Sequence, residues 1–244
     1  MKIVKAFFMC LGMFSAIPCP YRPWDEDARG LMTACLPIVG AVIGALWYAF
    51  ALIGQALLPE RLCAALIAAL PFLLTGFMHL DGFMDSADAL LSWRPLEQRQ
   101  KILKDVHCGS FSVVAVVLLI LGMFAAASDA KNCDLRPLIL IPAASRCLSA
   151  FCVTALRPIG HSEYASVRRS MATPLASLAM LVLTAVIGWI WIGAHAAVCI
   201  LAAAAGYAAA MFWAFRTLDG VSGDLAGYSL CIGELCGLAA LAIF

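Results

Sequence analysis

The feature that most constrains this chain is a series of long apolar stretches, each nearly free of charged residues. A helix needs about 20 apolar residues to cross the ~30 Å hydrocarbon layer of a bilayer. Seven stretches approach or exceed that length: 31–58, 62–80, 111–128, 138–156, 174–193, 196–215 and 225–244. Their apolar residues are continuous and do not alternate with polar ones as barrel strands do. They predict an all-α, polytopic membrane protein with about six to seven transmembrane helices.

Composition excludes a soluble fold. Hydrophobic residues make up 64% of the 244 residues and charged residues only 13%, whereas roughly a quarter of the residues in soluble domains are charged. The net charge of +1 gives no reason to expect a nucleic-acid partner. The eleven cysteines include no C-x-x-C pair and mostly lie in or beside the apolar stretches. We therefore expect them to pack as small hydrophobic residues.

Residues 3–17 form a shorter apolar segment that ends at the sequence IPCP. It is too short to cross the bilayer comfortably, so we expect an interfacial or half-inserted helix. No persuasive cleavage site follows it, and the segment is expected to be retained. Nothing indicates a second domain or an internal repeat, so residues 1–244 are predicted to form one integral-membrane domain.

The basic residues predict the orientation. With these spans, twelve of the sixteen Lys and Arg residues fall on one side: Lys2, Lys5, Arg22, Arg29, Arg94, Arg99, Lys101, Lys104, Arg157, Arg168, Arg169 and Arg216. The other side receives Arg61, Lys131 and Arg136. Because Lys and Arg concentrate in cytoplasmic loops, the first side is predicted to face the cytoplasm from a multi-pass position in the cytoplasmic (inner) membrane.

Acidic residues gather on the same side. The sequence HLDGFMDSAD, residues 79–88, places Asp81, Asp85 and Asp88 at spacings of four and three, which align on one face of a helix. Such like charges repel in a partly desolvated site, and a divalent cation would neutralise them. Oxygen ligands without a nearby His or Cys pair favour Mg²⁺ or Mn²⁺. Alternatively, these acids cap the span and face water.

A second polar segment, RQKILKDVHCGSFSVV, follows at residues 99–114. Gly109 begins the next apolar stretch, where a glycine lets the backbone approach a ligand and a helix N-terminus favours phosphate. Lys104 could pair with Asp105, hold a phosphate or mark the membrane boundary.

A third polar segment precedes and enters the last span. Gly220, Gly223 and Asp224 belong to a small-residue turn, and Glu234 lies inside the span. An unpaired charge at mid-membrane costs about 2 kcal/mol or more, and Arg146 in the fourth span raises the same problem. The two side chains either face each other or line a polar cavity. Together the three segments indicate a cytoplasm-facing, Mg²⁺-binding phosphate site suited to phosphoryl or phosphate-ester transfer.

Several motifs resemble the cobalamin synthase family, the adenosylcobinamide-GDP ribazoletransferases. In chain order they are FSAIPCP (14–20), LPIVGAVIGAL (36–46), HLDGFMDSADALLS (79–92), RQKILKDVHCGSFSV (99–113), RTLDGVSGDLAG (216–227) and GELCG (233–237). The match runs in order from the N-terminal segment to the last span. It implies Mg²⁺-dependent transfer of the adenosylcobinamide phosphate group from adenosylcobinamide-GDP to α-ribazole or its 5′-phosphate. The products are adenosylcobalamin, or its 5′-phosphate, and GMP. The oligomeric state and any contact with other enzymes of the pathway stay open.

The resemblance also implies site residues. Asp81, Asp85 and Asp88 match the metal and pyrophosphate site. The candidate catalytic residues are Asp81, Asp85, Asp88, Asp105 and Asp224. Apart from the resemblance, we infer that the general base is one of Asp88, Asp105 and Asp224. The candidate substrate-binding residues are His79, Lys104, Gly109, Arg146, Gly220, Gly223 and Glu234.

Three positions depart from the family pattern: His107 replaces Arg, and Ala89 and Asp219 each replace Gly. We expect a weaker or pH-dependent phosphate contact at His107. Asp219 is expected either to help bind the metal or to face water.

Two other classes of membrane protein share some of these features. Membrane enzymes that transfer phosphoalcohols to lipids also use spaced Asp residues, but their Asp-Gly-x-x-Ala-Arg element is absent here. A cation transporter would also gather carboxylates, but at mid-span and with inverted repeats.

Overall fold

A computed structural model describes residues 2–21, 24–130, 133–159 and 172–244. These residues form helices and contain no β-strand; the only extended pairing among them is an isolated parallel bridge between Pro158 and Val221. The helices are α1 (Lys2–Phe14), α2 (Glu26–Met32), α3 (Leu36–Leu57), α4 (Glu60–Leu74), α5 (Met78–Leu91), α6 (Leu96–Ile102), α7 (Ser110–Asp129), α8 (Ile141–Ala155), α9 (Ala172–Trp191), α10 (Ala194–Leu218) and α11 (Gly223–Ile243), with short 3₁₀ helices η1 (Thr33–Cys35) and η3 (Arg136–Ile139). The prediction of an all-α fold is confirmed.

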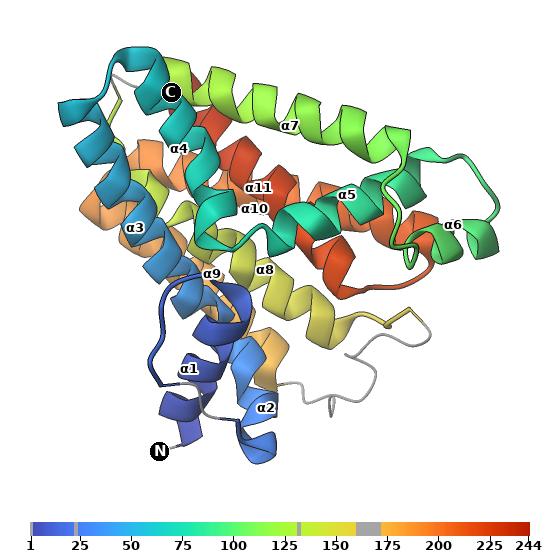
Figure 1. Ribbon diagram of the computed structural model, residues 1–244. Helices are drawn as coiled ribbons and strands as arrows, with labels where there is room; N and C mark the ends of the chain where they lie inside the picture. Colours follow the sequence, from blue (N-terminus) through green and yellow to red (C-terminus); the bar gives the residue numbers. More distant parts are fainter. Residues whose placement is uncertain (1, 22–23, 131–132, 160–171) are drawn as a thin grey trace.

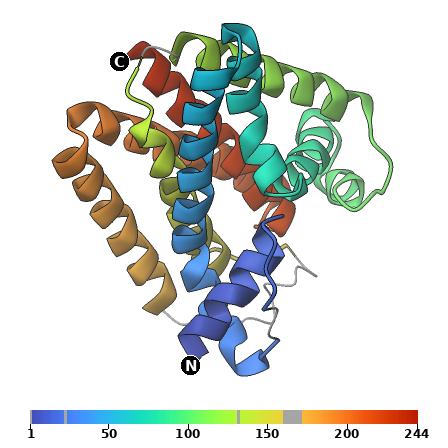
Figure 2. The ribbon, with the colours of Figure 1, turned by 60° about the vertical axis from the view of Figure 1, so that its left-hand side comes forward.

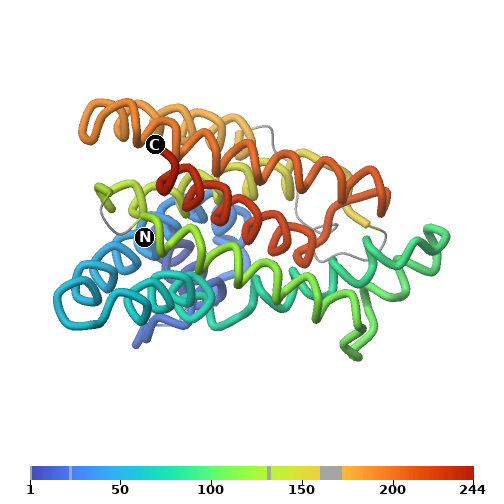
Figure 3. Tube along the Cα trace, turned by 90° about the horizontal axis from the view of Figure 1, so that it is seen from above, coloured from blue at the N-terminus to red at the C-terminus, as the bar shows by residue number. Residues whose placement is uncertain are grey.

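The long helices lie side by side around α11. Helix α10 packs along α11, which also contacts α5, α7 and α8, while α3 packs on α8 and α8 on α9 (Figures 1 and 2). From above, α7, α10 and α11 run along a common direction (Figure 3). Helices α1 and α2 lie against each other beside the start of α3. Helix α11 is therefore the element against which the polar segments are positioned.

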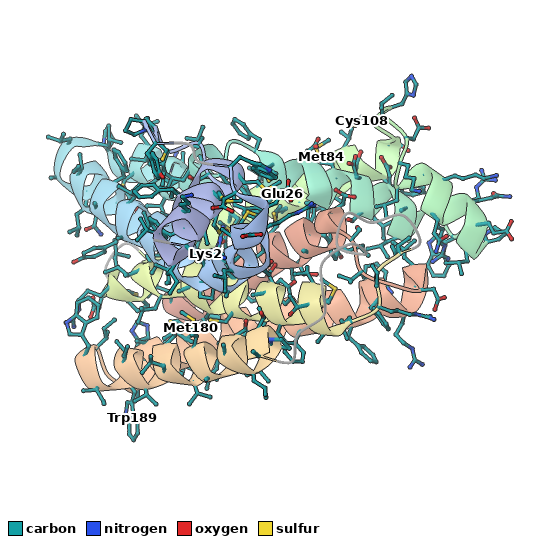
Figure 4. All side chains as sticks on the ribbon, turned by 90° about the horizontal axis from the view of Figure 1, so that it is seen from below. Lys2, Glu26, Met84, Cys108, Met180 and Trp189 are labelled. Atoms are coloured by element: carbon teal, nitrogen blue, oxygen red, sulfur yellow. The ribbon has the colours of Figure 1, made fainter. Side chains whose placement is uncertain are left out.

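Six segments are long and apolar enough to cross a membrane: Glu26–Leu57, Ser110–Asp129, Arg136–Ala155, Ala172–Trp191, Ala194–Leu218 and Gly223–Ile243. A seventh results if the bent pair α4 and α5 counts as one span. The outer helices keep large apolar side chains exposed, as at Leu118 and Trp189, and Trp189 points away from the bundle in Figure 4. These surfaces suit contact with lipid tails. The chain is a multi-pass helical membrane protein.

The predicted span 62–80 is wrong as a single straight helix. Helix α4 ends at Leu74 and α5 begins at Met78, with a bend of 89° between them. Gly76 and Phe77 have φ angles of 61° and 62°, which lie in the left-handed region and end a helix. Asp81, Asp85 and Asp88, called the acidic stripe below, therefore lie on α5, a helix separate from α4.

A proline also interrupts the hydrogen bonding of α4 shortly before this bend. Pro71 lies inside α4 and has no N–H, so the Ile67 carbonyl loses its helical partner. The indole Nε1 of Trp47, fully buried on α3, donates to that carbonyl at 2.8 Å. Helix α3 thus satisfies the group that the proline leaves free.

The N-terminal segment folds as the short helix α1. Its 13 residues span about 20 Å at 1.5 Å per residue, less than the hydrocarbon layer. Lys5 pairs with Asp25 at 2.9 Å and Lys2 with Asp27 at 3.3 Å, which ties α1 to the start of α2. A short helix is confirmed, and its interfacial position stays a prediction.

None of the eleven cysteines forms a disulfide bond, and most are buried, as expected for packing residues. Of the basic residues that predict the orientation, four lie outside the described residues: Arg22, Lys131, Arg168 and Arg169.

Candidate functional site

The crossing of α5 and α11 is made by two glycines. A Cβ atom at Gly82 would lie 2.9 Å from the Asp224 Cα, and one at Gly227 would lie 3.1 Å from the His79 carbonyl oxygen. Only residues without a side chain allow this approach. Stacking of Phe83 on Tyr228, with ring centroids 5.2 Å apart, adds to the contact. The crossing brings the start of α11 beside the acidic face of α5.

An acidic cluster, defined here as Asp81, Asp85 and Asp224, results from this crossing. Asp81 is exposed, and Asp85 and Asp224 are half-buried. The negative charges of Asp81, Asp224 and Asp88 all act on the Asp85 carboxylate. In Figure 4, the part of α5 that carries Met84 lies next to α11. The predicted helical stripe is confirmed, and a carboxylate more than 130 residues further along the chain joins it.

Asp88 has a different environment from its neighbours on the stripe. It is buried, and its Oδ2 accepts the Gly109 N–H at 2.6 Å while Oδ1 accepts the Ser112 N–H at 3.0 Å. These donors belong to the N-cap residue and to the first turn of α7, so Asp88 caps that helix. A Cβ atom at Gly109 would lie 2.4 Å from Asp88 Oδ1. The anion that approaches the Gly109 backbone in this structure is thus the chain's own carboxylate.

The ligands for a metal are fewer than the sequence suggests. Among the residues that the structure describes, no group of three or more His, Cys, Asp or Glu side chains could hold a metal ion as it stands. Asp88 already accepts two hydrogen bonds. The cluster still offers carboxylate oxygens, and Mg²⁺ commonly takes one or two of these with water and phosphate oxygens. The donor set fits Mg²⁺ in that limited sense, and the ion itself stays a prediction.

The second polar segment forms an exposed turn before α7. Asp105 accepts the His107 N–H at 3.0 Å and contacts His107 Nδ1 at 2.7 Å. These hydrogen bonds hold the pKa of Asp105 below its usual value. Lys104 is exposed and has no ion pair with Asp105 in this part of the structure. Asp105 is not among the charges that act on Asp85, so the two carboxylates belong to separate environments.

The third polar segment is fixed to the chain that follows α8. The Val221 N–H donates to the Arg157 carbonyl, and the Ile159 N–H donates to the Val221 carbonyl, each at 2.9 Å. A Cβ atom at Gly220 would lie 2.8 Å from the Ile159 nitrogen. Gly223 begins α11, one residue before Asp224. The glycines thus allow close backbone contacts that set the start of α11.

Asp219 is exposed, as one of the two expectations for it requires. Its carboxylate forms an ion pair with Arg157. Both side chains are about half exposed, so this pair contributes little stability. It joins the same two chain segments as the backbone bridge.

Arg146 and Glu234 face each other, as one of the two sequence interpretations requires. Arg146 Nη1 donates to Glu234 Oε1 at 2.6 Å and to the Pro142 carbonyl at 3.1 Å. Arg146 is completely buried and Glu234 nearly so. Glu234 lies ten residues from Asp224, about 15 Å along α11. The pair links α8 to α11 inside the bundle, and its predicted part in substrate binding stays a prediction.

A pocket of about 140 Å³ lies beside Asp224. Its walls come from five helices and include Phe14, Leu36, Met78, His79, Ser149 and Leu230, with Gly223 and Asp224. His79 is buried, and its Nε2 has no hydrogen-bond partner among the described residues. This pocket is not predictable from the sequence, because residues so far apart in the chain show no common pattern. The lone histidine beside the acidic stripe was its only signal.

Known proteins are similar to this sequence throughout its length. The profile of the family described as cobalamin-5-phosphate synthase matches residues 6–242. The adenosylcobinamide-GDP ribazoletransferase of Clostridium perfringens strain 13 is 40% identical over 252 aligned positions, covering 100% of each chain. Proteins of the same name from Clostridium botulinum strain Alaska E43 and Geobacillus kaustophilus are 34% and 28% identical, covering 100% and 94% of this chain and 99% and 92% of theirs. No solved structure is significantly similar to the chain.

Proposed function

This chain belongs to the cobalamin-5-phosphate synthase family, and we propose that it acts as an adenosylcobinamide-GDP ribazoletransferase. It transfers the adenosylcobinamide phosphate group from adenosylcobinamide-GDP to α-ribazole or to α-ribazole 5′-phosphate. The products are adenosylcobalamin, or its 5′-phosphate, and GMP.

The convergence of Asp81, Asp85 and Asp224 at the α5–α11 crossing is the observation that supports this chemistry best. A diphosphate donor brings several negative charges, which a bare carboxylate cluster would repel. Asp81 and Asp85 would hold Mg²⁺, which when bound neutralises the diphosphate and the charge that develops on the departing GMP. Lys104, exposed on the turn that precedes α7, is assigned to a phosphate oxygen of the donor.

In the transfer, a ribose hydroxyl of the acceptor attacks the phosphorus that bears the cobinamide arm. A new phosphorus–oxygen bond forms, the bond to the GMP phosphate breaks, and the hydroxyl proton passes to a base. Because the 5′-phosphorylated acceptor is also proposed as a substrate, the attacking group is a hydroxyl of the ribose ring and not the one at the 5′ position.

Asp224 is the best placed of the three candidate bases. Asp88 accepts two backbone hydrogen bonds, and Asp105 is exposed and paired with His107. Asp224 is half-buried beside the acidic cluster and lines the pocket. We assign it the role of accepting the proton from the ribose hydroxyl.

We further propose that the site faces the cytoplasm from the cytoplasmic membrane. The support is the distribution of basic residues, twelve on the side of the acidic cluster and three on the other.

The test uses purified protein in lipid nanodiscs with Mg²⁺, adenosylcobinamide-GDP and α-ribazole, followed for GMP and the complete corrinoid. Absence of both products with the unaltered protein would overturn the proposed activity. Asp81→Asn and Asp85→Asn should each abolish transfer while leaving the protein folded. Asp129→Asn, at an exposed carboxylate at the other end of α7, serves as the matched control. Near-normal turnover in both cluster variants would remove the metal-site proposal.

A further inference from the structure

We propose that the pocket beside Asp224 binds the aromatic base of the acceptor nucleoside, and that His79 recognises this base. The inference rests on the proposed function and extends it, because it assigns one substrate to one subsite and names a residue that determines specificity.

The size of the pocket limits what can enter it. Its volume is about 140 Å³, whereas pockets for drug-sized ligands have volumes of about 300 Å³ or more. A corrinoid or a complete nucleoside is too large for this space. A single fused aromatic ring system is the part of the two substrates that suits it.

The walls are mainly apolar. Phe14 of α1, Leu36 of α3, Met78 of α5 and Leu230 of α11 contribute large hydrophobic side chains. Burial of an aromatic ring against such walls is favourable, because the apolar surfaces of both the ring and the walls are removed from water. The pocket therefore favours a flat apolar base over a charged or strongly hydrated group.

His79 provides a polar group in these walls. Its side chain lines the pocket and is more than nine-tenths buried, and its Nε2 lacks a hydrogen-bond partner among the described residues. Native structures rarely leave a buried polar atom unpaired. The backbone around the ring is fixed, since the Cys231 thiol donates to the His79 carbonyl at 3.4 Å and Gly227 packs against it. A held imidazole with a free nitrogen is suited to pair with a ligand.

The base of α-ribazole has the matching chemistry. It is a benzimidazole, with apolar edges and one unsubstituted ring nitrogen, which can pair with one imidazole nitrogen. Guanine, the base of the donor nucleotide, carries donors and acceptors along two edges. Besides His79, the polar side chains in this wall are Ser149 and Asp224. These are too few for all the donors and acceptors of guanine, which would lose hydrogen bonds on entry.

The position of the pocket connects binding to chemistry. Gly223 and Asp224 form part of its wall, and the charge of Asp224 also acts on Asp85 in the acidic cluster. A base held in the pocket places its ribose on the side of Asp224, where the reacting hydroxyl needs a proton acceptor. One pocket thus selects the acceptor and orients it toward the donor phosphate.

The test measures binding of α-ribazole and of free benzimidazole by calorimetry, to protein in nanodiscs without Mg²⁺ or donor. His79→Leu should weaken both interactions about tenfold, the effect of one lost hydrogen bond. His79→Gln, whose amide can replace Nε2, should recover most of the affinity. His195→Leu is the matched control, because His195 Nε2 also lacks a partner among the described residues but belongs to α10 away from the pocket.

A second variant tests the cavity without removing the histidine. Ala226 lines the pocket, and Ala226→Leu should reduce its volume and weaken binding by about tenfold or more. Ala242→Leu, near the other end of the same helix, controls for the added side chain. In turnover with the proposed substrates, both pocket variants should raise the KM for α-ribazole while the KM for adenosylcobinamide-GDP stays unchanged.

The outcomes separate this inference from the proposed function. If the unaltered protein makes GMP but neither pocket variant changes α-ribazole binding, or if they raise only the KM for the donor, the subsite assignment fails and the activity stands. Displacement of benzimidazole by guanosine at similar concentration would also overturn the assignment. If the unaltered protein neither binds α-ribazole nor forms products, both proposals fail.

Discussion

The carboxylate of Asp88 meets the backbone N–H of Gly109 at 2.6 Å and so joins α5 to the first turn of α7. Gly109 permits this contact because a Cβ atom there would lie 2.4 Å from the Asp88 oxygen. Two residues proposed from sequence as ligands of metal and phosphate thus bind each other. Their common role in the structure is to hold the acidic face of α5 against α7.

Replacing Asp88 with Ala should destabilise the protein. The N–H groups of Gly109 and Ser112 at the start of α7 would lose their partner in a partly buried place, at a cost of about 2 kcal/mol in the free energy of unfolding. Gly109→Ala should be destabilising for the steric reason given above. Unfolding in mixed detergent measures both effects, with Asp129→Asn as the control. A loss of turnover in Asp88→Ala at unchanged stability would indicate a direct catalytic role for Asp88.

The pairing of Asp105 with His107 predicts a pH effect. The hydrogen bonds from His107 lower the pKa of Asp105 in the folded protein, so their contribution to stability is present above the pKa of the unfolded chain, about 3.9. It is lost as the pH falls through the lowered pKa of the folded state. In His107→Ala, the Asp105 pKa should rise toward its ordinary value, as measured by carboxyl ¹³C NMR. An unchanged Asp105 pKa would contradict the assigned cause.

The sequence predicts those features that depend on residues close together in the chain. The spans follow from continuous apolar stretches, and the stripe of Asp81 and Asp85 follows from their spacing on one helix. The bend before the stripe was missed, because a left-handed conformation at Phe77 is not apparent from a residue type that rarely adopts it. Pro71 was visible in the sequence, but its effect depends on Trp47 from another helix.

Contacts between distant segments were predicted only where a physical requirement demanded a partner. Arg146 and Glu234 were candidates for a pair because each is costly alone in a membrane span. No such requirement connects Gly82 with Asp224, although their contact positions the acidic cluster. The pocket around His79 depends on five helices and follows only from the structure.

The buried pair of Arg146 and Glu234 should be strongly coupled. Removing one partner leaves the other charge buried without compensation, so Arg146→Met and Glu234→Leu should each lower the free energy of unfolding by about 3–5 kcal/mol. The double variant should lose much less than the sum, because no buried charge remains. Detergent unfolding of the four proteins provides the double-mutant cycle. Additive losses would show that the two side chains do not interact in the folded protein.

The close approach of α5 and α11 at Gly82 should be more important for activity than for folding. In Gly82→Ala, the new methyl group would lie 2.9 Å from the Asp224 Cα, so the start of α11 must move away from Asp81 and Asp85. Because catalysis depends on positions within a fraction of an ångström, we expect turnover to fall about a hundredfold. The helical content should stay unchanged by circular dichroism. Gly12→Ala and Gly30→Ala are matched controls, since no atom lies within 4 Å of a Cβ at either position. Full activity of Gly82→Ala would show that the spacing between Asp224 and the α5 carboxylates does not limit the reaction.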